Sequence, residues 1–121
     1  MRLLKRVEYE AVYGAGQRRS SPQFAVFFRS QPEIPREAPG DKAAGPGRAS
    51  RFGISVKKAL GGAVVRNRIR RRIREILRRN RTEIPNGWDI VIHPRRSVAE
   101  APFAPLEAEL VRLLRGLKPK A

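Results

Sequence analysis

The densest group of chemically active side chains is an arginine-rich run at residues 66–81, RNRIRRRIREILRRNR. The run holds nine arginines and a single acidic residue, Glu75. Arginine stays charged, binds phosphate oxygens in pairs through its planar guanidinium, and stacks on nucleobases. A charged face that serves only solubility normally mixes Glu with Lys, and this one does not. The run therefore predicts a surface for a polyanion, and nucleic acid is favoured.

A helical repeat sorts this run into two faces. At about 100° per residue, the branched apolar side chains fall on one side and can pack against a sheet. They are Val65, Ile69, Ile73, Ile76 and Leu77. The opposite side carries Asn67, Arg70, Arg71, Arg74 and Arg78, flanked by Arg68, Arg72 and Arg79. Basic amphipathic helices also bind anionic membranes. Here the apolar stripe is needed for the core, so RNA is the favoured partner and no membrane is expected.

A second group combines aromatic and basic side chains near the start of the chain. Tyr9 and Tyr13 lie four residues apart, with Arg2 and Arg6 beside them. They fall opposite a predicted buried stripe of Leu3, Leu4, Val7 and Ala11. Aromatic rings beside arginines can stack unpaired bases, as in single-strand binding. Alternatively, the tyrosines pack against a strand face that carries Ala25 and Phe27. The residues alone favour neither interpretation.

The sequence offers no candidate for a catalytic site of its own. A metal or acid–base nuclease site would gather carboxylates and histidines. The single histidine, His93, is interpreted as structural, and Asp41 and Asp89 fall in separate segments. Glu107 and Glu109 are two apart on a predicted helix, so they do not face each other. We expect no catalytic side chains and no metal held by the protein.

Length and composition suit a small RNA-binding protein. The 121 residues allow one domain, and 27 Lys and Arg against 11 Asp and Glu give a net charge of +16. Such an excess favours a polyanionic partner. There is no cysteine, which excludes disulfides and thiolate metal sites. The apolar runs are short and the first residues do not form a signal peptide, so a cytoplasmic location is expected.

Alternation and helical spacing predict one sheet covered by helices. The expected order is helix 3–13, strand 23–29, strand 51–57, helix 63–79, strand 88–93 and helix 105–117. In the first strand, Phe24, Val26 and Phe28 share one face. Ala25, Phe27 and Arg29 share the other. Residues 32–50 are rich in Pro and Gly and are interpreted as a mobile loop inserted into a single domain spanning 1–121.

The segment ISVKKALGGAVVRNRIRRRIRE at residues 54–75 resembles the signature of the bacterial ribonuclease P protein subunit. The resemblance extends over nearly the whole chain. LLKRVEYEAVYGAG is similar to the first helix of that family, SSPQFAVFF to its first strand and WDIVIHPRR to a later strand. It implies an α+β fold, a two-layer α/β sandwich of the α-β-β-β-α-β-α type like domain 2 of ribosomal protein S5. It also implies a left-handed β-α-β crossover, which is rare in proteins.

The resemblance also implies a function. The RNA subunit of that enzyme removes the 5′ leader of precursor tRNA, with Mg²⁺ held mainly by RNA, and the protein subunit binds both RNAs. It implies no small-molecule substrate. By position, the residues matching the family's contact with the catalytic RNA are Arg66, Asn67, Arg68, Arg70, Arg71 and Arg74, with Lys57 and Lys58 in the basic lead-in. Those matching the leader cleft are Tyr9, Tyr13, Ala25 and Phe27.

Two other functions compete with this one. A ribosomal protein that only organises RNA would have the basic surface without needing exposed tyrosines. A stand-alone nuclease would cleave RNA with no RNA subunit present. The aromatic cleft and the missing catalytic residues favour the ribonuclease P subunit.

Overall fold

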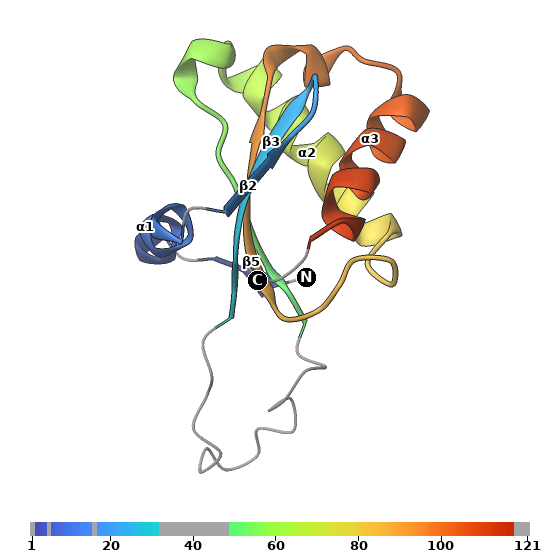
Figure 1. Ribbon diagram of the computed structural model, residues 1–121. Coiled ribbons are helices and arrows are strands. Elements are labelled where there is room, and N and C mark those ends of the chain that lie inside the picture. The colour runs from blue at the N-terminus through green and yellow to red at the C-terminus, as the bar shows by residue number, and fades with distance from the viewer. Residues whose placement is uncertain (1, 5, 16, 32–48, 118–121) are drawn as a thin grey trace.

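The computed structural model describes residues 2–4, 6–15, 17–31 and 49–117. In this part of the chain, a five-stranded sheet has α1 on one face and α2 and α3 on the other (Figure 1). The elements are β1 (Arg2–Leu3), α1 (Arg6–Gly14), β2 (Gln17–Ser20), β3 (Phe24–Ser30), β4 (Arg51–Ile54), η1 (Lys58–Leu60), α2 (Ala63–Arg79), β5 (Trp88–Pro94), η2 (Arg96–Ala99) and α3 (Phe103–Arg115). The two η elements are short 3₁₀ helices.

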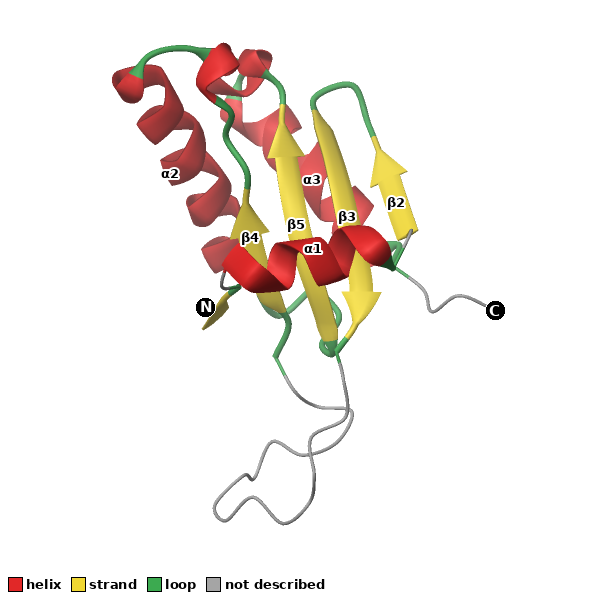
Figure 2. Ribbon diagram, turned by 90° about the vertical axis from the view of Figure 1, so that its left-hand side faces the viewer, coloured by secondary structure: helices red, strands yellow, loops and turns green. Residues whose placement is uncertain are grey.

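The sheet is mixed, with the strand order β1-β4-β5-β3-β2. β1 and β4 are parallel, as are β4 and β5, whereas β3 runs antiparallel to β5 and to β2. In Figure 2, β4 and β5 both run upward, α2 passes behind the sheet, and β5 lies to the right of β4. This is the left-handed β-α-β crossover that the resemblance implies.

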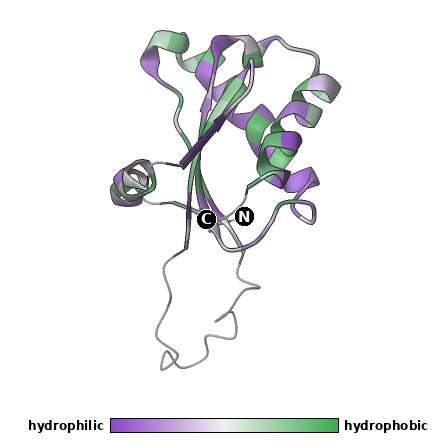
Figure 3. Ribbon diagram, viewed as in Figure 1, coloured by the Kyte–Doolittle hydropathy of each residue, from purple (hydrophilic) through white to green (hydrophobic). Residues whose placement is uncertain are grey.

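The main core lies between the sheet and the pair α2 and α3. Alternation in β3 buries Phe24, Val26 and Phe28, as expected from the sequence. From α2 the buried side chains are Ile69, Ile73, Ile76 and Leu77, and α3 adds Leu106, Leu110, Val111, Leu113 and Leu114. Fully burying such a side chain contributes roughly 1.5–3 kcal/mol. Both helices alternate between hydrophobic and hydrophilic residues along their length (Figure 3).

The start of the chain differs from the prediction. The helix begins at Arg6, not at residue 3, because Arg2 and Leu3 form a short strand beside β4. Leu4 and Val12 are buried on this side of the sheet, whereas Ala11 is exposed, so the predicted stripe was wrong at Ala11. The side chains of Leu3 and Val7 lie outside the described residues, as do those of Arg2 and Arg6.

Two further boundaries were not foreseen. The strand β2 has the sequence QRRS, which carries no apolar residue, so alternation could not reveal it; it forms by pairing with β3 at the sheet edge. The last helix begins at Phe103, two residues before the predicted start, and Pro102 precedes it as the N-cap. The predicted loop spans residues 32–50. All of it except residues 49 and 50 lies outside the described part of the chain. The single-domain assignment stays a prediction.

Candidate nucleic-acid interface

The arginine-rich helix α2 begins at a tight turn built from glycine. Gly61 has φ of +146°, a conformation that other residues rarely adopt. A side chain there would also press against Val65, with a Cβ only 3.1 Å from that side chain. This turn takes the chain from η1, which starts at Lys58, directly into α2. It therefore places the lysines and the arginines of the signature side by side.

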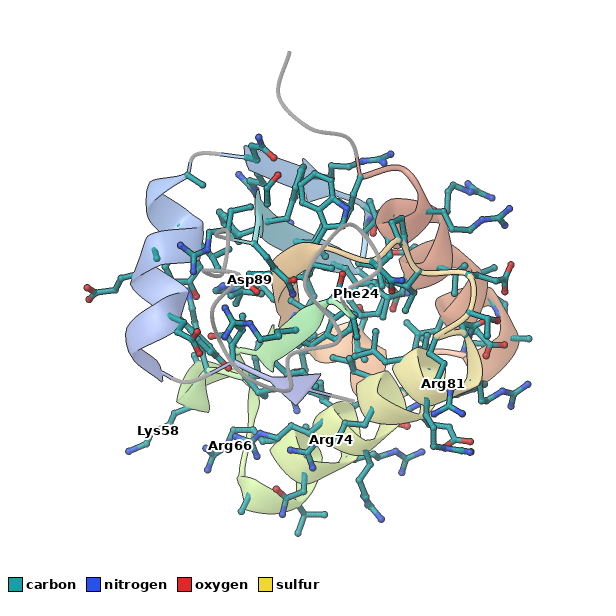
Figure 4. The ribbon with its side chains drawn as sticks, turned by 90° about the horizontal axis from the view of Figure 1, so that it is seen from below. Phe24, Lys58, Arg66, Arg74, Arg81 and Asp89 are labelled. Atoms are coloured by element: carbon teal, nitrogen blue, oxygen red, sulfur yellow. The ribbon has the colours of Figure 1, made fainter. Side chains whose placement is uncertain are left out.

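The predicted RNA-binding residues lie together on this part of the structure. Lys57, Lys58, Asn67, Arg68, Arg71 and Arg74 are exposed, and Arg66 and Arg70 are partly buried. Lys58, Arg66 and Arg74 lie on the same side of the molecule in Figure 4. One guanidinium nitrogen of Arg70 donates to Oδ1 of Asn67 over 3.0 Å, which orients both side chains. We call Arg66, Asn67, Arg68, Arg70, Arg71 and Arg74 the arginine face.

Two arginines that the helical repeat placed beside this face have other partners. Arg72 donates through Nη1 to the carbonyl oxygens of Val98 at 3.0 Å and Ala99 at 2.9 Å, and through Nη2 to that of Ala101. Arg79 forms an ion pair with Glu107, with 3.2 Å between Nε and Oε2. These two guanidiniums hold η2 and α3 against α2. Helical spacing alone could not distinguish them from the arginines of the arginine face.

On the other face of the sheet, three rings meet where α1 crosses β3 and β5. The ring centroids of Tyr13 and Phe27 are 5.2 Å apart, and those of Phe27 and His93 are 5.0 Å apart. Both contacts are edge-to-face, the favoured arrangement for aromatic pairs. The register explains the cluster, because Ala25 pairs with His93 and Phe27 with Val91 across the two strands.

A groove opens beside these rings. It is lined by Ala25, Phe27 and His93 and by four cations, Arg18, Lys57, Arg95 and Arg96. The guanidinium carbon of Arg18 lies 5.5 Å from the centroid of the Phe27 ring, within cation–π range. We call this feature, together with Tyr13 at its border, the aromatic groove. Lys57 lines the groove and precedes Lys58 of η1, so the groove continues toward the arginine face.

The two tyrosines are not equivalent. Tyr13 has 37% of its surface exposed, yet its ring packs against Phe27. Tyr9 is only partly exposed and covers Gly53 so closely that a Cβ there would lie 2.5 Å from the ring. Of the two interpretations that the sequence left open, packing against the sheet therefore holds for both tyrosines. Packing against the sheet and facing the groove are compatible for Tyr13.

The surroundings of His93 in the groove favour the neutral form of its imidazole. Burial lowers the pKa of His93 below its ordinary value of 6.5, and the charges of Lys57 and Arg18 lower it further. Burial raises the pKa of Tyr13, while a hydrogen bond with Ser55 opposes that change. The Tyr13 hydroxyl lies 2.8 Å from Nε2 of His93. A neutral imidazole with its proton on Nδ1 accepts this hydrogen bond.

The position of α1 over the sheet depends on a buried ionic network. Asp89 is fully buried in β5 and accepts hydrogen bonds from Arg51 at 2.8 and 2.7 Å and from Arg29 at 3.1 Å. The hydrogen bond to Asp89 raises the pKa of Arg51. Arg51 also forms an ion pair with Glu8 of α1, with 2.5 Å between Nη1 and Oε2. The network thus connects α1 to three strands.

Sequence reasoning missed several groove residues. His93 was interpreted as structural, and no role was assigned to Arg18, Arg95 or Arg96. Alternation within the strand 88–93 does place His93 on the face away from Trp88, the available signal. The pairing of β3 with β5, which brings His93 to Phe27, is not visible in the sequence.

Within the described residues, no three His, Asp or Glu side chains are grouped to hold a metal ion, and no helix is long and apolar enough to cross a membrane.

Together, the mixed sheet with its left-handed crossover, the arginine face and the aromatic groove define a small RNA-binding α+β protein. The family model for ribonuclease P matches residues 1–118. The chain belongs to the ribonuclease P protein family. The fold and the recognition made from the sequence are thereby confirmed.

Individual relatives agree over the full length. The ribonuclease P protein component of Desulfovibrio desulfuricans is 38% identical over 97% of this chain and 82% of its own length. That of Geobacillus kaustophilus is 36% identical over 97% and 88%. Among solved structures, the ribonuclease P protein of Thermotoga maritima superimposes with a TM-score of 0.79 at 30% identity, covering 98% of both chains.

Family membership establishes the activity to which the chain contributes. It is the protein component of the ribonucleoprotein endonuclease ribonuclease P, with a role in tRNA 5′ maturation. Association with the RNA of ribonuclease P follows from that membership. The cytoplasmic location expected from the sequence stays a prediction.

Proposed function

We propose that the chain binds the catalytic RNA through the arginine face, with Lys57 and Lys58, and holds the 5′ leader of precursor tRNA in the aromatic groove. The observation that carries the proposal is the meeting of three rings, Tyr13, Phe27 and His93, beside four cations. Stacked rings hold unpaired bases and cations hold the phosphates between them. A leader is single-stranded, so its bases are free to stack.

The arginine face is suited to a different RNA surface. Its side chains project from a rigid helix whose apolar stripe is fixed in the core. Guanidiniums at successive turns match a row of phosphates on structured RNA, and each can bind two phosphate oxygens. Both surfaces meet at Lys57, so one protein can contact the catalytic RNA and the leader of its substrate together.

In this proposal the protein performs no chemistry. The hydrolysis belongs to the RNA, and Mg²⁺ held mainly by the RNA supplies the metal chemistry of the reaction. The chain's own residues bind and orient: the groove fixes the leader, and the arginine face fixes the protein on the RNA. Neutralising phosphates on both RNAs reduces the repulsion between them and so raises the affinity for precursor tRNA.

The decisive experiment measures cleavage of precursor tRNA at physiological magnesium by a matched bacterial catalytic RNA, with and without this protein. Stimulation by the protein, with no cleavage by the protein alone, is expected. Tight RNA binding without stimulation would instead identify a scaffold, and cleavage by the protein alone would identify a nuclease. Measuring the affinity of the assembled enzyme for mature tRNA, which has no leader, separates the two surfaces, because only the groove should lose its contact.

A further inference from the structure

A separate hollow lies at the C-terminal end of α2, where the following turn meets the start of β4. Its volume is about 240 Å³. Its apolar lining comes from Ala49, Phe52, Leu77, Ile84 and Pro85. Arg78 and Arg81 also line it, and both are exposed. The hollow belongs neither to the aromatic groove nor to the predicted RNA-binding residues. We call it the α2-end pocket.

Hydrogen bonds hold the walls of this pocket in place. Gln31 donates through Nε2 to the carbonyl oxygens of Ala49 at 2.9 Å and Trp88 at 3.2 Å. The Ser50 hydroxyl donates to the carbonyl oxygen of Pro85 at 2.7 Å and accepts from the backbone N–H of Trp88 at 2.9 Å. The strand start and the turn are therefore fixed to each other. Because the Ser50 hydroxyl is already used twice, an occupant is held mainly by apolar contact.

The volume of the α2-end pocket and the charges around it limit the kind of molecule that it can hold. Pockets for drug-sized ligands measure roughly 300–1,000 Å³, so about 240 Å³ suits a single planar ring system. The carbonyl end of α2 makes the interior unfavourable for an anion. Negative charge is favoured at the rim instead, where Arg81 has no ion pair within the described residues. A planar ring inside and an anion outside describe a nucleotide.

We propose that the α2-end pocket takes one unpaired nucleotide of the partner RNA, with its base inside and its phosphate at Arg81. The proposal rests on the association with the RNA of ribonuclease P. Arg74 and Arg78 lie one turn apart on α2, and Arg81 follows two residues beyond the end of the helix, in the turn that borders the pocket. Figure 4 shows Arg66, Arg74 and Arg81 following α2 toward this end. RNA bound along the arginine face therefore reaches the pocket.

The first test uses AMP as the probe and follows backbone amide shifts by NMR in the full chain. AMP should shift the amides of Ser50, Ile84 and Asn86 in a saturable way. Adenosine should bind more weakly because it lacks the phosphate, and ribose 5-phosphate should leave these amides unchanged. Shifts confined to the aromatic groove would overturn the proposal. Equal binding of toluene and AMP would also overturn it, because that marks a general apolar hollow.

Three variants sharpen the test. Ala49→Trp puts an indole at the exposed mouth of the pocket and should abolish the AMP shifts. Arg81→Ala should weaken AMP binding roughly threefold to tenfold, as expected for one exposed charge-assisted contact. Arg112→Ala removes the same charge from an exposed site on α3 and should change nothing. Native-like AMP binding by both pocket variants would overturn the proposal.

The outcome is independent of the leader-groove proposal. AMP binding is measured on the free protein, whereas stimulation of cleavage is measured with catalytic RNA and precursor. A protein that stimulates cleavage but shows no AMP shifts in the pocket refutes the pocket alone. One that binds AMP there but gives no stimulation refutes the proposed function and leaves the pocket intact.

Discussion

The hydroxyl of Tyr13 and Nε2 of His93 lie 2.8 Å apart, although 80 positions separate the two residues in the chain. This contact joins α1 to β5 across the mouth of the aromatic groove. A neutral imidazole with its proton on Nδ1 accepts from the Tyr13 hydroxyl, whereas a protonated one donates to the hydroxyl oxygen, so protonation of His93 reverses this hydrogen bond. The groove is therefore organised by a group whose ordinary pKa of 6.5 lies close to physiological pH.

The lowered pKa of His93 predicts how folding stability depends on pH. Burial, then Lys57 and Arg18, disfavour the imidazolium in the folded protein. The unfolded chain then binds the proton more readily, so the stabilisation is complete above about pH 6.5 and is lost as the pH falls below it. Urea unfolding from about pH 8 to about pH 5.5 should show the decline. In His93→Gln the decline should be smaller, and an unchanged pH profile would contradict the assignment.

Tyr13 should contribute to leader binding through its ring. Tyr13→Ala removes the ring at the border of the aromatic groove, and stacking on one base is worth roughly 1–3 kcal/mol. Affinity for precursor tRNA should fall accordingly in the assembled enzyme, while affinity for mature tRNA stays unchanged. Val64→Ala is the matched control, because Val64 is 80% exposed at the start of α2, outside the groove. Equal losses for precursor and mature tRNA would exclude a leader contact.

Gly53 provides an indirect test of Tyr9. A Cβ on Gly53 would lie 2.5 Å from Cζ of Tyr9, so Gly53→Ala must displace the ring. The displaced atoms are the far end of the side chain, so we expect a modest destabilisation, roughly 1 kcal/mol. If Tyr9 contacts the leader, precursor affinity falls while mature tRNA binding does not.

Two comparisons control this experiment. Gly14→Ala adds the same methyl group where nothing lies within 4 Å, and it should leave leader binding unchanged. Combining Gly53→Ala with Tyr9→Ala should give no further loss beyond Tyr9→Ala alone, because the clash then has no partner. Additive losses would mean that Gly53 acts through something other than Tyr9.

The sequence predicts the buried positions that repeat along one helix or strand. It does not predict contacts between elements that are distant in the chain. Ile69, Ile73 and Phe24 were assigned to the core from spacing alone, and they are buried. β2 escaped prediction because QRRS has no apolar alternation and becomes a strand only through its pairing with β3. Arg72 was indistinguishable from its neighbours, because its acceptors are carbonyls that lie more than 25 residues further along.

The same limit applies to the candidate site. The arginine face lies on one helix, so helical spacing placed Asn67, Arg70, Arg71 and Arg74 on one side, with Arg68 flanking them, whereas Arg66 came from the family resemblance. The aromatic groove needs residues from α1, β2, β3 and β5, and spacing identified only Tyr13, Ala25 and Phe27 of them. The ring contacts of His93 could not be foreseen, because its neighbours come from a different strand and a different helix. Strand pairing, which sets those contacts, depends on tertiary structure.

The buried carboxylate of Asp89 should be essential for stability. Asp89→Asn removes the buried anion that Arg29 and Arg51 share and leaves Arg51 only its ion pair with Glu8, and breaking such a network typically costs about 3–5 kcal/mol. Urea unfolding at neutral pH measures the change. Glu75→Gln removes an ion pair with Arg78 that is exposed on α2, and it should have little effect. A similar, small loss in both variants would show that the Asp89 network is dispensable.

Charge reversal on the arginine face should separate RNA docking from folding. Arg70→Glu with Arg74→Glu places two carboxylates where the proposal puts RNA phosphates, and assembly with the catalytic RNA should be abolished. Arg112→Glu with Arg115→Glu makes the same change of net charge on α3, and it should weaken binding far less. Binding measured over a range of salt concentrations shows how many phosphate contacts each double variant loses. Each lost contact makes the fall of log K with log salt less steep by about 0.9 for a duplex. Unchanged assembly of the α2 variant, with a native unfolding transition, would move the docking surface away from α2.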